Sequence, residues 1–180
     1  MTEQLNGKRV ALLVADGFEQ VELAEPKRAL EGAGAIAQIV SPADGQVKGW
    51  QHTDWGDAFD VDVPLDEASG ADFDALVLPG GVMNPDALRQ NEAAVAFVRS
   101  FFDQHKPVAA ICHGGWTLAE ADVLQGRRVT SYPSIQTDLK NAGAVWVDEE
   151  VVDDNGLITS RNPHDLPAFN AKLIEKIAAG

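Results

Sequence analysis

The chain has 180 residues, and its 28 acidic residues against 14 lysines and arginines leave a formal charge of −14. A surface this acidic repels phosphate, which disfavours nucleic acid as a partner, and the single cysteine excludes an intrachain disulfide and the small disulfide-rich secreted folds. The apolar runs are far shorter than the ~20 residues that cross a membrane, and the first residues lack the segments of a signal peptide. We therefore expect a cytoplasmic protein with no nucleic acid and no membrane as partner.

Four short apolar runs without alternation follow one another along the chain, at residues 9–14, 36–40, 75–78 and 107–111. Continuous apolar runs of this length are typical of strands that are covered on both faces. Amphipathic segments with a helical period follow them, at residues 22–32, 87–105, 116–124, 135–142 and 166–178. Strands that alternate with helices predict right-handed crossovers and a parallel sheet.

Two further segments interrupt this alternation, residues 46–63 and 145–159, and both are expected to form hairpins or edge strands on the main sheet. No repeat or change in composition divides the chain, so we expect one domain over residues 1–180. The predicted fold is α/β: a flavodoxin-like, doubly wound and mainly parallel sheet, with helices on both faces and small hairpins at its edges.

The residues that follow the strands carry the strongest functional signal. Ligands of an open parallel sheet bind beyond the carboxyl ends of its strands. The first strand is followed by Asp16 and Glu19, the third by the Gly80-Gly81 turn, and the fourth by residues 112–115, Cys-His-Gly-Gly. We therefore expect carboxylates, a glycine turn, a thiol and an imidazole at one edge of the sheet.

Cys112 has two interpretations. A free cysteine at the end of an apolar run is often simply a core residue. However, a strand that turns sharply into a helix through Gly114 and Gly115 resembles a nucleophile elbow. An elbow places the thiol at a helix N-terminus, where amide N–H groups and the helix dipole favour the thiolate. We therefore favour a reactive Cys112.

The neighbours of Cys112 are more ambiguous. Adjacent side chains on an extended chain point to opposite sides, so His113 meets the thiol only where the elbow is tightly bent; otherwise its backbone N–H is the useful group. Glu19 is either a solvated loop or capping carboxylate, or a carboxyl beside the thiol. Gly80 and Gly81 form either a plain turn or a close backbone approach that supplies an oxyanion N–H.

Other candidate residues have weaker support. Asp86 lies at the predicted start of a helix, and no spacing links it to the thiol. The remaining histidines, His52, His105 and His164, share no metal-ligand spacing, so we expect no metal. No Gly-x-Gly-x-x-Gly follows the first strand, and carboxylates occupy the place of a phosphate, so we expect no cofactor.

These residues together resemble the ThiJ/PfpI family, whose fold is shared with class I glutamine amidotransferases. The resemblance runs from about residue 8 to residue 177 and is strongest to the branch of PfpI-like intracellular proteases and general stress proteins. The matching segments are residues 15–19 with 21–23, 78–81, 110–114, 126–127 with 130–133, 141–143 with 147–148, and 159–163 with 165–167.

The resemblance implies a role for each residue around the thiol. Cys112 is implied as the reactive group, Glu19 as its hydrogen-bond partner and His113 as the paired imidazole. The N–H groups of Gly81 and His113 are implied as the oxyanion hole, with Gly80 and Gly114 in the adjoining turns. Members of the family form dimers or larger rings, so we expect a homodimer or a higher homo-oligomer.

Two residues depart from the pattern of this branch. An acidic residue from a neighbouring subunit completes the site there, and Asp86 stands where Glu is usual, with a shorter side chain. Gly115 stands where Pro usually follows Cys-His-Gly, which makes the elbow less preorganised.

Two functions follow from a reactive cysteine at an elbow. The first is a cysteine hydrolase that acts on peptides, or on reactive aldehydes of the glyoxal type and their adducts. Peptide cleavage needs a good acid for the amine leaving group, so a small carbonyl substrate is favoured over strong protease activity. The alternative is a stress or redox sensor, or a chaperone, that works through oxidation of the same cysteine without turnover. No second cysteine is present to resolve a sulfenic acid.

Overall fold

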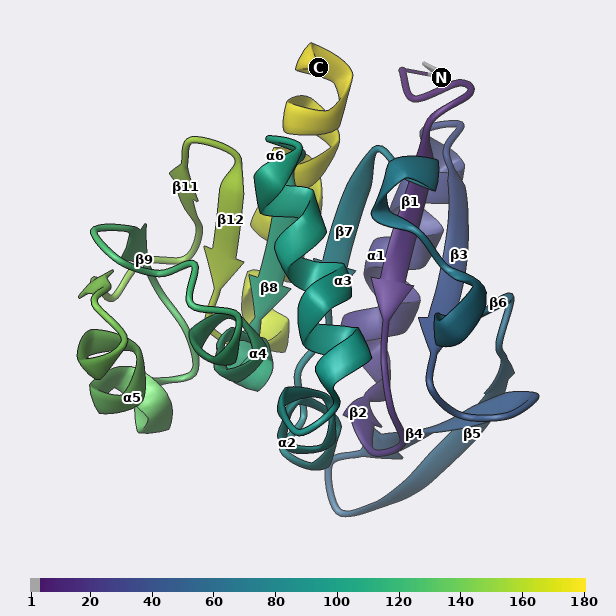
Figure 1. Ribbon diagram of the computed structural model, residues 1–180, viewed down its shortest axis with the longest axis horizontal. Helices are drawn as coiled ribbons and strands as arrows, with labels where there is room; N and C mark the ends of the chain where they lie inside the picture. The colour runs from purple at the N-terminus through teal and green to yellow at the C-terminus, as the bar shows by residue number, and fades with distance from the viewer. Residues whose placement is uncertain (1–3) are drawn as a thin grey trace.

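A computed structural model describes residues 4–180, which form a central seven-stranded sheet with helices on both faces (Figure 1). The strand order is β11-β12-β8-β7-β1-β3-β6, and every neighbouring pair except β11–β12 is parallel. The predicted α/β, mainly parallel fold is confirmed. The strands are β1 (Arg9–Leu13), β3 (Ile36–Ser41), β6 (Val63–Pro64), β7 (Ala75–Leu78), β8 (Val108–Ile111), β11 (Val152–Asp154) and β12 (Leu157–Ser160).

The sheet is held by two apolar layers, one on each face. Every residue of β7 and β8 is buried, as expected for continuous apolar runs. On one face the core includes residues of α1 (Gln20–Gly32) and α6 (Leu166–Ala179). On the other it includes residues of α2 (Met83–Arg89), α3 (Glu92–Asp103), α4 (Gly115–Glu120) and α5 (Gln136–Asn141).

The helix expected at residues 87–105 is two helices, α2 and α3, so that prediction was wrong in its extent. The side chain of Asn91 lies between them and accepts a hydrogen bond of 3.0 Å from the backbone N–H of Ala94. An asparagine in this capping position satisfies an amide that has no partner within the helix, and so starts α3 afresh. The shorter of the two helices, α2, begins at Met83, two residues after the Gly80-Gly81 turn.

The hairpin segments also differ from expectation. Within residues 46–63, β4 (Gln46–Gln51) and β5 (Asp54–Asp60) form the expected hairpin, but it pairs with β2 (Phe18–Glu19) in a separate small sheet, and only Val63 joins the main sheet, in the edge strand β6. In the second segment β12 is an inner strand parallel to β8, and only β11 lies at the edge. A short parallel pair, β9 (Arg128–Val129) and β10 (Val145–Trp146), lies apart.

The carboxyl ends of β1, β7 and β8 share one edge of the sheet, where β2, α2 and α4 gather (Figure 1). The chain moves from β1 to β3 on one side, and later returns to β7 and β8 on the other. The strand order therefore reverses at β1, which is where an open sheet leaves room for a ligand. No helix within residues 4–180 has the length and apolarity needed to cross a membrane.

Candidate active site

Cys112 occupies a strained turn between β8 and α4. The strand ends at Ile111, and a single 3-10 turn, Cys112–Gly114, leads into α4. The backbone φ of Cys112 is 60°, in the left-handed region that a side chain other than glycine rarely adopts. Such strain costs on the order of 1–3 kcal/mol and is concentrated at functional sites. The turn has the form expected of a nucleophile elbow, with the thiol only 8% exposed.

The tight bend brings the thiol and the imidazole of adjacent residues together. Sγ of Cys112 lies 3.2 Å from Nδ1 of His113. The imidazole is packed between two aromatic rings, stacked on Tyr132 at 4.9 Å and edge-on to Trp116 at 5.2 Å. Burial lowers the pKa of His113, so the imidazole is neutral at neutral pH. A neutral imidazole with one free nitrogen at the thiol is placed to take its proton.

The backbone N–H groups of Gly81 and His113 lie close enough to the sulfur of Cys112 to lower the pKa of its thiol. Gly81 has a φ of +77°, and a Cβ there would lie 2.6 Å from the carbonyl oxygen of Gly17. A Cβ on Gly80 would lie 2.6 Å from Cβ of Cys112. Both glycines therefore serve a close approach of backbone to thiol, and a plain turn does not explain them.

The two glycines after the imidazole pack against different elements. A Cβ on Gly114 would lie 2.6 Å from the carbonyl oxygen of Leu78, so the elbow touches the end of β7. A Cβ on Gly115 would lie 3.1 Å from a methyl group of Leu139 on α5. A side chain at position 114 would therefore clash with the backbone of β7, so glycine is required there. At position 115 a side chain would press only on the side chain of Leu139, at the contact between α4 and α5.

The carboxyl group that the structure places at the thiol belongs to Glu22, a residue that the sequence analysis did not propose. Glu22 is fully buried, and its Oε1 accepts a hydrogen bond of 2.9 Å from the N–H of Gly80. Its carboxyl lies close enough to Cys112 for each group to shift the pKa of the other, and its Oε2 is buried without a hydrogen-bond partner among the described residues. Burial raises the pKa of Glu22 to about 8, so at neutral pH the carboxyl is protonated and is a hydrogen-bond donor.

A spacing of four residues identifies this carboxyl in the sequence. Glu22, Pro26 and Leu30 are buried in succession along one face of α1, and Phe18 of β2, four residues before Glu22, is buried as well. Residues four apart share a face of a helix. A glutamate within an otherwise apolar row of this kind is the signal that could have found Glu22.

Glu19 lies close to the site but bonds elsewhere. Its Oε2 accepts a hydrogen bond of 3.3 Å from the N–H of His52 and lies 3.8 Å from Nδ1 of the same residue. Its charge raises the pKa of both Glu22 and Cys112, so it lies within electrostatic reach of them. The carboxyl beside the thiol is therefore that of Glu22, on the buried face of α1, whereas the side chain of Glu19, which is 15% exposed and lies just before α1, turns toward His52.

The thiol is not acidified in this environment, contrary to the expectation from its position at a helix start. Burial, and after it the charge of Glu22, raises the pKa of the Cys112 thiol. The N–H groups of Gly81 and His113 act in the opposite direction with smaller effect. In the resting protein the thiol therefore keeps its proton, and a base must remove it when the substrate arrives.

Asp86 stands apart from the thiol within its own chain. It is exposed in the first turn of α2, and among residues 4–180 its carboxylate makes no recorded contact with Cys112 or His113. Its contribution to the site of a neighbouring subunit stays a prediction. No group of three or more His, Cys, Asp or Glu side chains between residues 4 and 180 is arranged to hold a metal ion.

Asn84, three residues after the glycine turn, is a second residue that the sequence analysis missed. Its side chain is fully buried. Its Oδ1 accepts a hydrogen bond of 2.7 Å from the N–H of Ala15, and its Nδ2 donates to the carbonyl oxygens of Pro79 and Gly80 at 3.0 and 3.1 Å. Asn84 therefore ties the turn after β7 to the end of β1, which sets where the N–H of Gly81 points.

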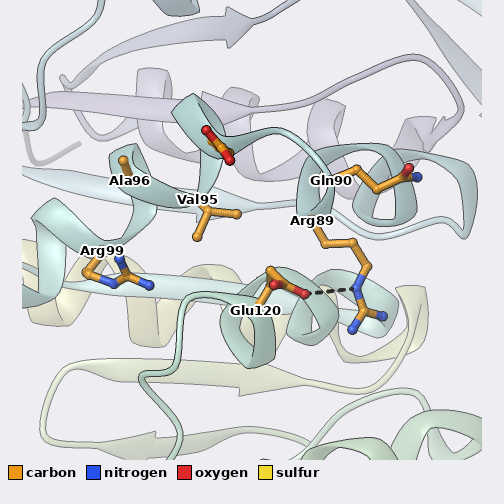
Figure 2. Close-up of a pocket in the computed structure, with 7 residues that line it drawn as sticks. Arg89, Gln90, Val95, Ala96, Arg99 and Glu120 are labelled. Atoms are coloured by element: carbon orange, nitrogen blue, oxygen red, sulfur yellow. Dashed lines mark ion pairs between the residues drawn. The ribbon is translucent and has the colours of Figure 1, made fainter.

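A cleft of about 550 Å³ lies beside the site, between α2, α3 and α4 (Figure 2). Arg89 and Glu120 face each other across it, with Nε of the arginine 3.8 Å from the carboxylate. The guanidinium group of Arg89 also lies 5.5 Å from the ring centre of Trp116, which packs on His113. The cleft is thus separated from the imidazole by one aromatic ring.

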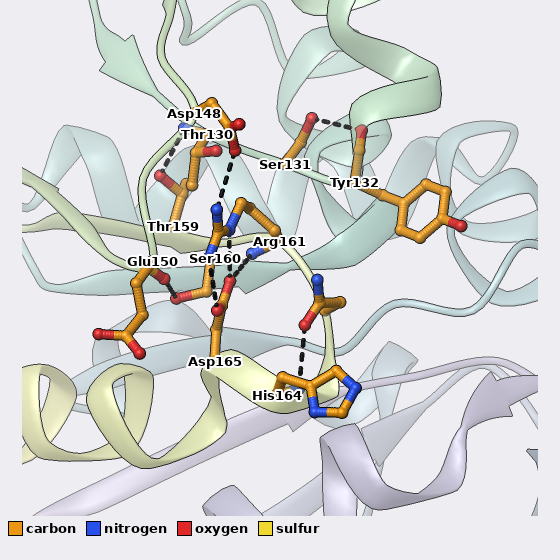
Figure 3. A network of polar contacts seen from close by, with 11 residues as sticks. Thr130, Ser131, Tyr132, Asp148, Glu150, Thr159, Ser160, Arg161, His164 and Asp165 are labelled. Carbon is orange, nitrogen blue, oxygen red and sulfur yellow. Dashed lines mark hydrogen bonds and ion pairs between the residues drawn. The ribbon is translucent and has the colours of Figure 1, made fainter.

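A polar network holds the loop on the other side of the imidazole (Figure 3). Arg161 donates to Asp165 at 2.9 and 3.0 Å and to Asp148 at 2.9 Å, which joins the start of α6 to the segment after β10. The N–H of Thr130 donates to Oγ1 of Thr159 at 3.0 Å. These bonds fix the loop that carries Tyr132.

Comparisons with known proteins agree with this geometry. The model of the DJ-1/PfpI family matches residues 8–176. General stress protein 18 of Bacillus subtilis is 43% identical over 175 residues, which cover 94% of this chain and 99% of that protein. Deglycase TK1284 of Thermococcus kodakarensis is 43% identical over 167 residues, covering 93% of this chain and 98% of that protein.

A solved structure gives the same result for the fold. The crystal structure of Drosophila melanogaster DJ-1beta superposes with a TM-score of 0.86 at 30% identity, covering all of this chain (100%) and 92% of that one. Family model, sequence relatives and solved structure each span nearly the whole chain. The chain belongs to the DJ-1/PfpI family.

Proposed function

We propose that the protein is a cysteine-dependent hydrolase that acts on small reactive carbonyl compounds of the glyoxal type, or on the adducts that such compounds form with amines. The observation that supports this proposal is the set of groups around Sγ of Cys112. Sγ of Cys112 is 3.2 Å from Nδ1 of His113, and the N–H groups of Gly81 and His113 lie near enough to it to lower the pKa of the thiol. A nucleophile, a base and two oxyanion donors therefore meet at the end of β8.

The proposed chemistry begins with a proton transfer. Nδ1 of His113 takes the proton of the Cys112 thiol as Sγ attacks the carbonyl carbon of the substrate. The carbonyl oxygen becomes an alkoxide and accepts hydrogen bonds from the N–H groups of Gly81 and His113. The imidazolium then returns its proton to this oxygen, which gives a neutral thiohemiacetal. For a 2-oxo aldehyde, proton shifts between the two carbons and their two oxygens convert this thiohemiacetal to the isomeric thioester, and water hydrolyses the thioester to the hydroxy acid and the free thiol.

The step after the attack favours carbonyl substrates over peptides. Both routes pass through the same imidazolium of His113, whose pKa is lowered by burial, so the substrates differ only in the step that follows. An amide nitrogen leaves only when it is protonated, whereas addition to an aldehyde needs no leaving group. A relative with 43% identity is named a deglycase, which supports a carbonyl adduct as the substrate class.

The alternative function, a stress sensor that works by oxidation of Cys112, has its own supporting observation. The carboxyl of Glu22, whose pKa burial raises to about 8, lies beside Cys112, and its Oε2 has no hydrogen-bond partner among the described residues. A protonated carboxyl donates to an oxygen on sulfur, and so would stabilise a sulfinate. A relative with 43% identity is named general stress protein 18, which supports a role in stress.

Assembly into a homodimer or a larger homo-oligomer belongs to the same proposal. Large apolar side chains around the elbow are exposed, Val82 by 53%, Met83 by 42% and Tyr132 by 41%. A second copy of the chain that covers them would also bring in Asp86, which lies on the same short helix as Met83. Light scattering on the purified protein measures the mass, and a monomer at micromolar concentration would overturn this part.

Two measurements separate the two functions. The hydrolase consumes methylglyoxal, and Cys112→Ala abolishes this while Cys112→Ser retains at most a trace, because an alcohol is a far weaker nucleophile than a thiol. Consumption that survives Cys112→Ala would overturn the hydrolase. The sensor instead gains two oxygens on Cys112 under mild peroxide without turnover, which mass spectrometry of the intact protein detects.

A further inference from the structure

The second nitrogen of the His113 imidazole has a partner that neither the resemblance nor the proposed chemistry uses. Nε2 of His113 lies 3.2 Å from Oγ of Ser134. We propose that Ser134 is a positioning residue: its hydroxyl oxygen accepts the Nε2–H of His113 and so keeps Nδ1 free to take the proton of Cys112. The part of this inference that concerns turnover rests on the proposed function, whereas the position of the proton on the imidazole does not.

The argument follows from the single proton of a neutral imidazole. One ring nitrogen carries the proton and the other carries a lone pair. Because burial lowers the pKa of His113, the neutral form prevails at neutral pH. Nδ1 serves as a base only when the proton is on Nε2, and an acceptor beside Nε2 stabilises that tautomer. Ser134 is in that place.

The loop before α5 holds the hydroxyl where the imidazole needs it. The N–H of Tyr132 donates to the carbonyl oxygen of Cys112 itself at 3.1 Å. A 3-10 turn, Pro133–Ile135, follows, closed by the N–H of Ile135 on the carbonyl oxygen of Tyr132 at 3.2 Å. Ser134 is the middle residue of this turn, and the hydrogen bond between Tyr132 and Cys112 fixes the position of the turn relative to the nucleophile.

The ring itself is restrained on both sides. Tyr132 stacks on the imidazole with an angle of 24° between the planes, and Trp116 packs edge-on against it at 68°. The indole N–H of Trp116 donates to Asp138 at 2.8 Å, which fixes that ring in turn. An imidazole held between two aromatic rings keeps Nδ1 on the thiol and Nε2 on the hydroxyl.

The hydroxyl serves both protonation states. When His113 takes the proton of Cys112, its Nδ1–H faces the thiolate and its Nε2–H still donates to Ser134, so the hydrogen bond to Ser134 is kept.

The titratable groups in contact with the ring are the thiol of Cys112 and the phenol of Tyr132, with Asp138 and Arg89 beyond Trp116. The element that orients the imidazole therefore lies in the same chain as the thiol.

The test compares the wild type with Ser134→Ala, Ser134→Thr and the control Ser69→Ala, which removes a capping hydroxyl from a distant 3-10 turn. Nitrogen-15 NMR of the His113 ring reports its tautomer and pKa without any substrate. We expect the Nε2–H tautomer in the wild type. Ser134→Ala should weaken this preference and lower the pKa of His113, because the imidazolium loses an acceptor, while Ser134→Thr should restore both.

Turnover gives the second readout. Loss of one neutral hydrogen bond lowers kcat for methylglyoxal about threefold to tenfold in Ser134→Ala, with KM unchanged, and Ser134→Thr recovers most of it. An Nδ1–H tautomer in the wild-type protein would overturn the proposal without any variant. So would a Ser134→Ala protein whose His113 tautomer and pKa match the wild type. If no variant turns over methylglyoxal while the NMR changes occur, the proposed substrate fails and the role of Ser134 stands.

Discussion

Glu22 and Gly80, which are 58 residues apart in the chain, are joined by a buried hydrogen bond of 2.9 Å from the glycine N–H to Oε1 of the glutamate. This bond links α1 to the turn after β7, and the thiol of Cys112 lies against both. The carboxyl therefore acts on the site in two ways. It fixes the turn that presents the N–H of Gly81, and its charge state controls the thiol.

Glu22→Gln should make the thiol more reactive above about pH 8, where Glu22 is ionised. Burial and the charge of Glu22 raise the pKa of Cys112, and the substitution removes that charge while keeping an N–H donor for the sulfur. We expect the pH profile of alkylation by iodoacetamide to move down by about one unit. Glu31→Gln, an exposed position on the same helix, is the control and should leave the profile unchanged. A profile that stays in place or moves up contradicts the assignment of Glu22.

The same carboxyl should make stability depend on pH. Burial raises the pKa of Glu22 from its ordinary value of 4.5 to about 8 in the folded protein, so between these pH values the folded state retains a proton that the unfolded state has lost. The stabilisation is complete below pH 4.5, falls as the pH rises, and is gone above about pH 8, with a total on the order of a few kcal/mol. Urea unfolding should show the wild type weakening from pH 5 to pH 8.5 more steeply than Glu22→Gln. Parallel slopes would mean that this carboxyl ionises normally.

Gly81→Ala and Gly45→Ala form a matched pair. Both glycines have a positive φ, +77° and +73°, but only a Cβ on Gly81 meets other atoms, 2.6 Å from an oxygen of Gly17. Each substitution should cost about 1 kcal/mol from backbone strain. Gly81→Ala should in addition displace an oxyanion donor and lower kcat about a hundredfold. Methylglyoxal kinetics and urea unfolding on both variants measure this, and equal kcat values would exclude the N–H of Gly81 from the chemistry.

Asn84→Asp should be nearly as damaging as Asn84→Ala. The amide of Asn84 accepts from Ala15 and donates to the carbonyl oxygens of Pro79 and Gly80. Aspartate keeps the acceptor but places a carboxylate against two carbonyl oxygens, so both variants should lose about 2–4 kcal/mol of unfolding free energy. Urea unfolding measures the loss. An Asn84→Asp protein as stable as the wild type would show that the two donated bonds contribute little.

The sequence predicted those parts of the fold in which a local residue pattern, such as a continuous apolar run, is typical of one kind of element. Continuous apolar runs became β1, β3, β7 and β8 because only buried strands of a parallel sheet have such runs. The strand β12 was misplaced at an edge, because its neighbour along the chain, β11, pairs antiparallel and suggests a plain hairpin. Its parallel partner β8 is remote in the sequence, and no local pattern reports such pairing.

The site shows the same division. Cys112 and Gly81 were predictable, because a thiol at an elbow and a glycine turn after a strand are visible in the sequence and in the family resemblance. Glu22 was not found, because the choice between it and Glu19 depends on which face of α1 is buried. Ser134 contacts His113 through a turn whose position is fixed by a hydrogen bond to Cys112, and such a bond has no signature along the chain.

The left-handed backbone at Cys112 means that the residue needed for the chemistry is not the residue that would make the fold most stable. With a φ of 60°, this residue is more easily accommodated as glycine than as any residue with a side chain. A laboratory selection for heat resistance alone would therefore favour Cys112→Gly, and the survivors would be robust proteins without a thiol. A cysteine retained here in a lineage is evidence that its sulfur has been under selection.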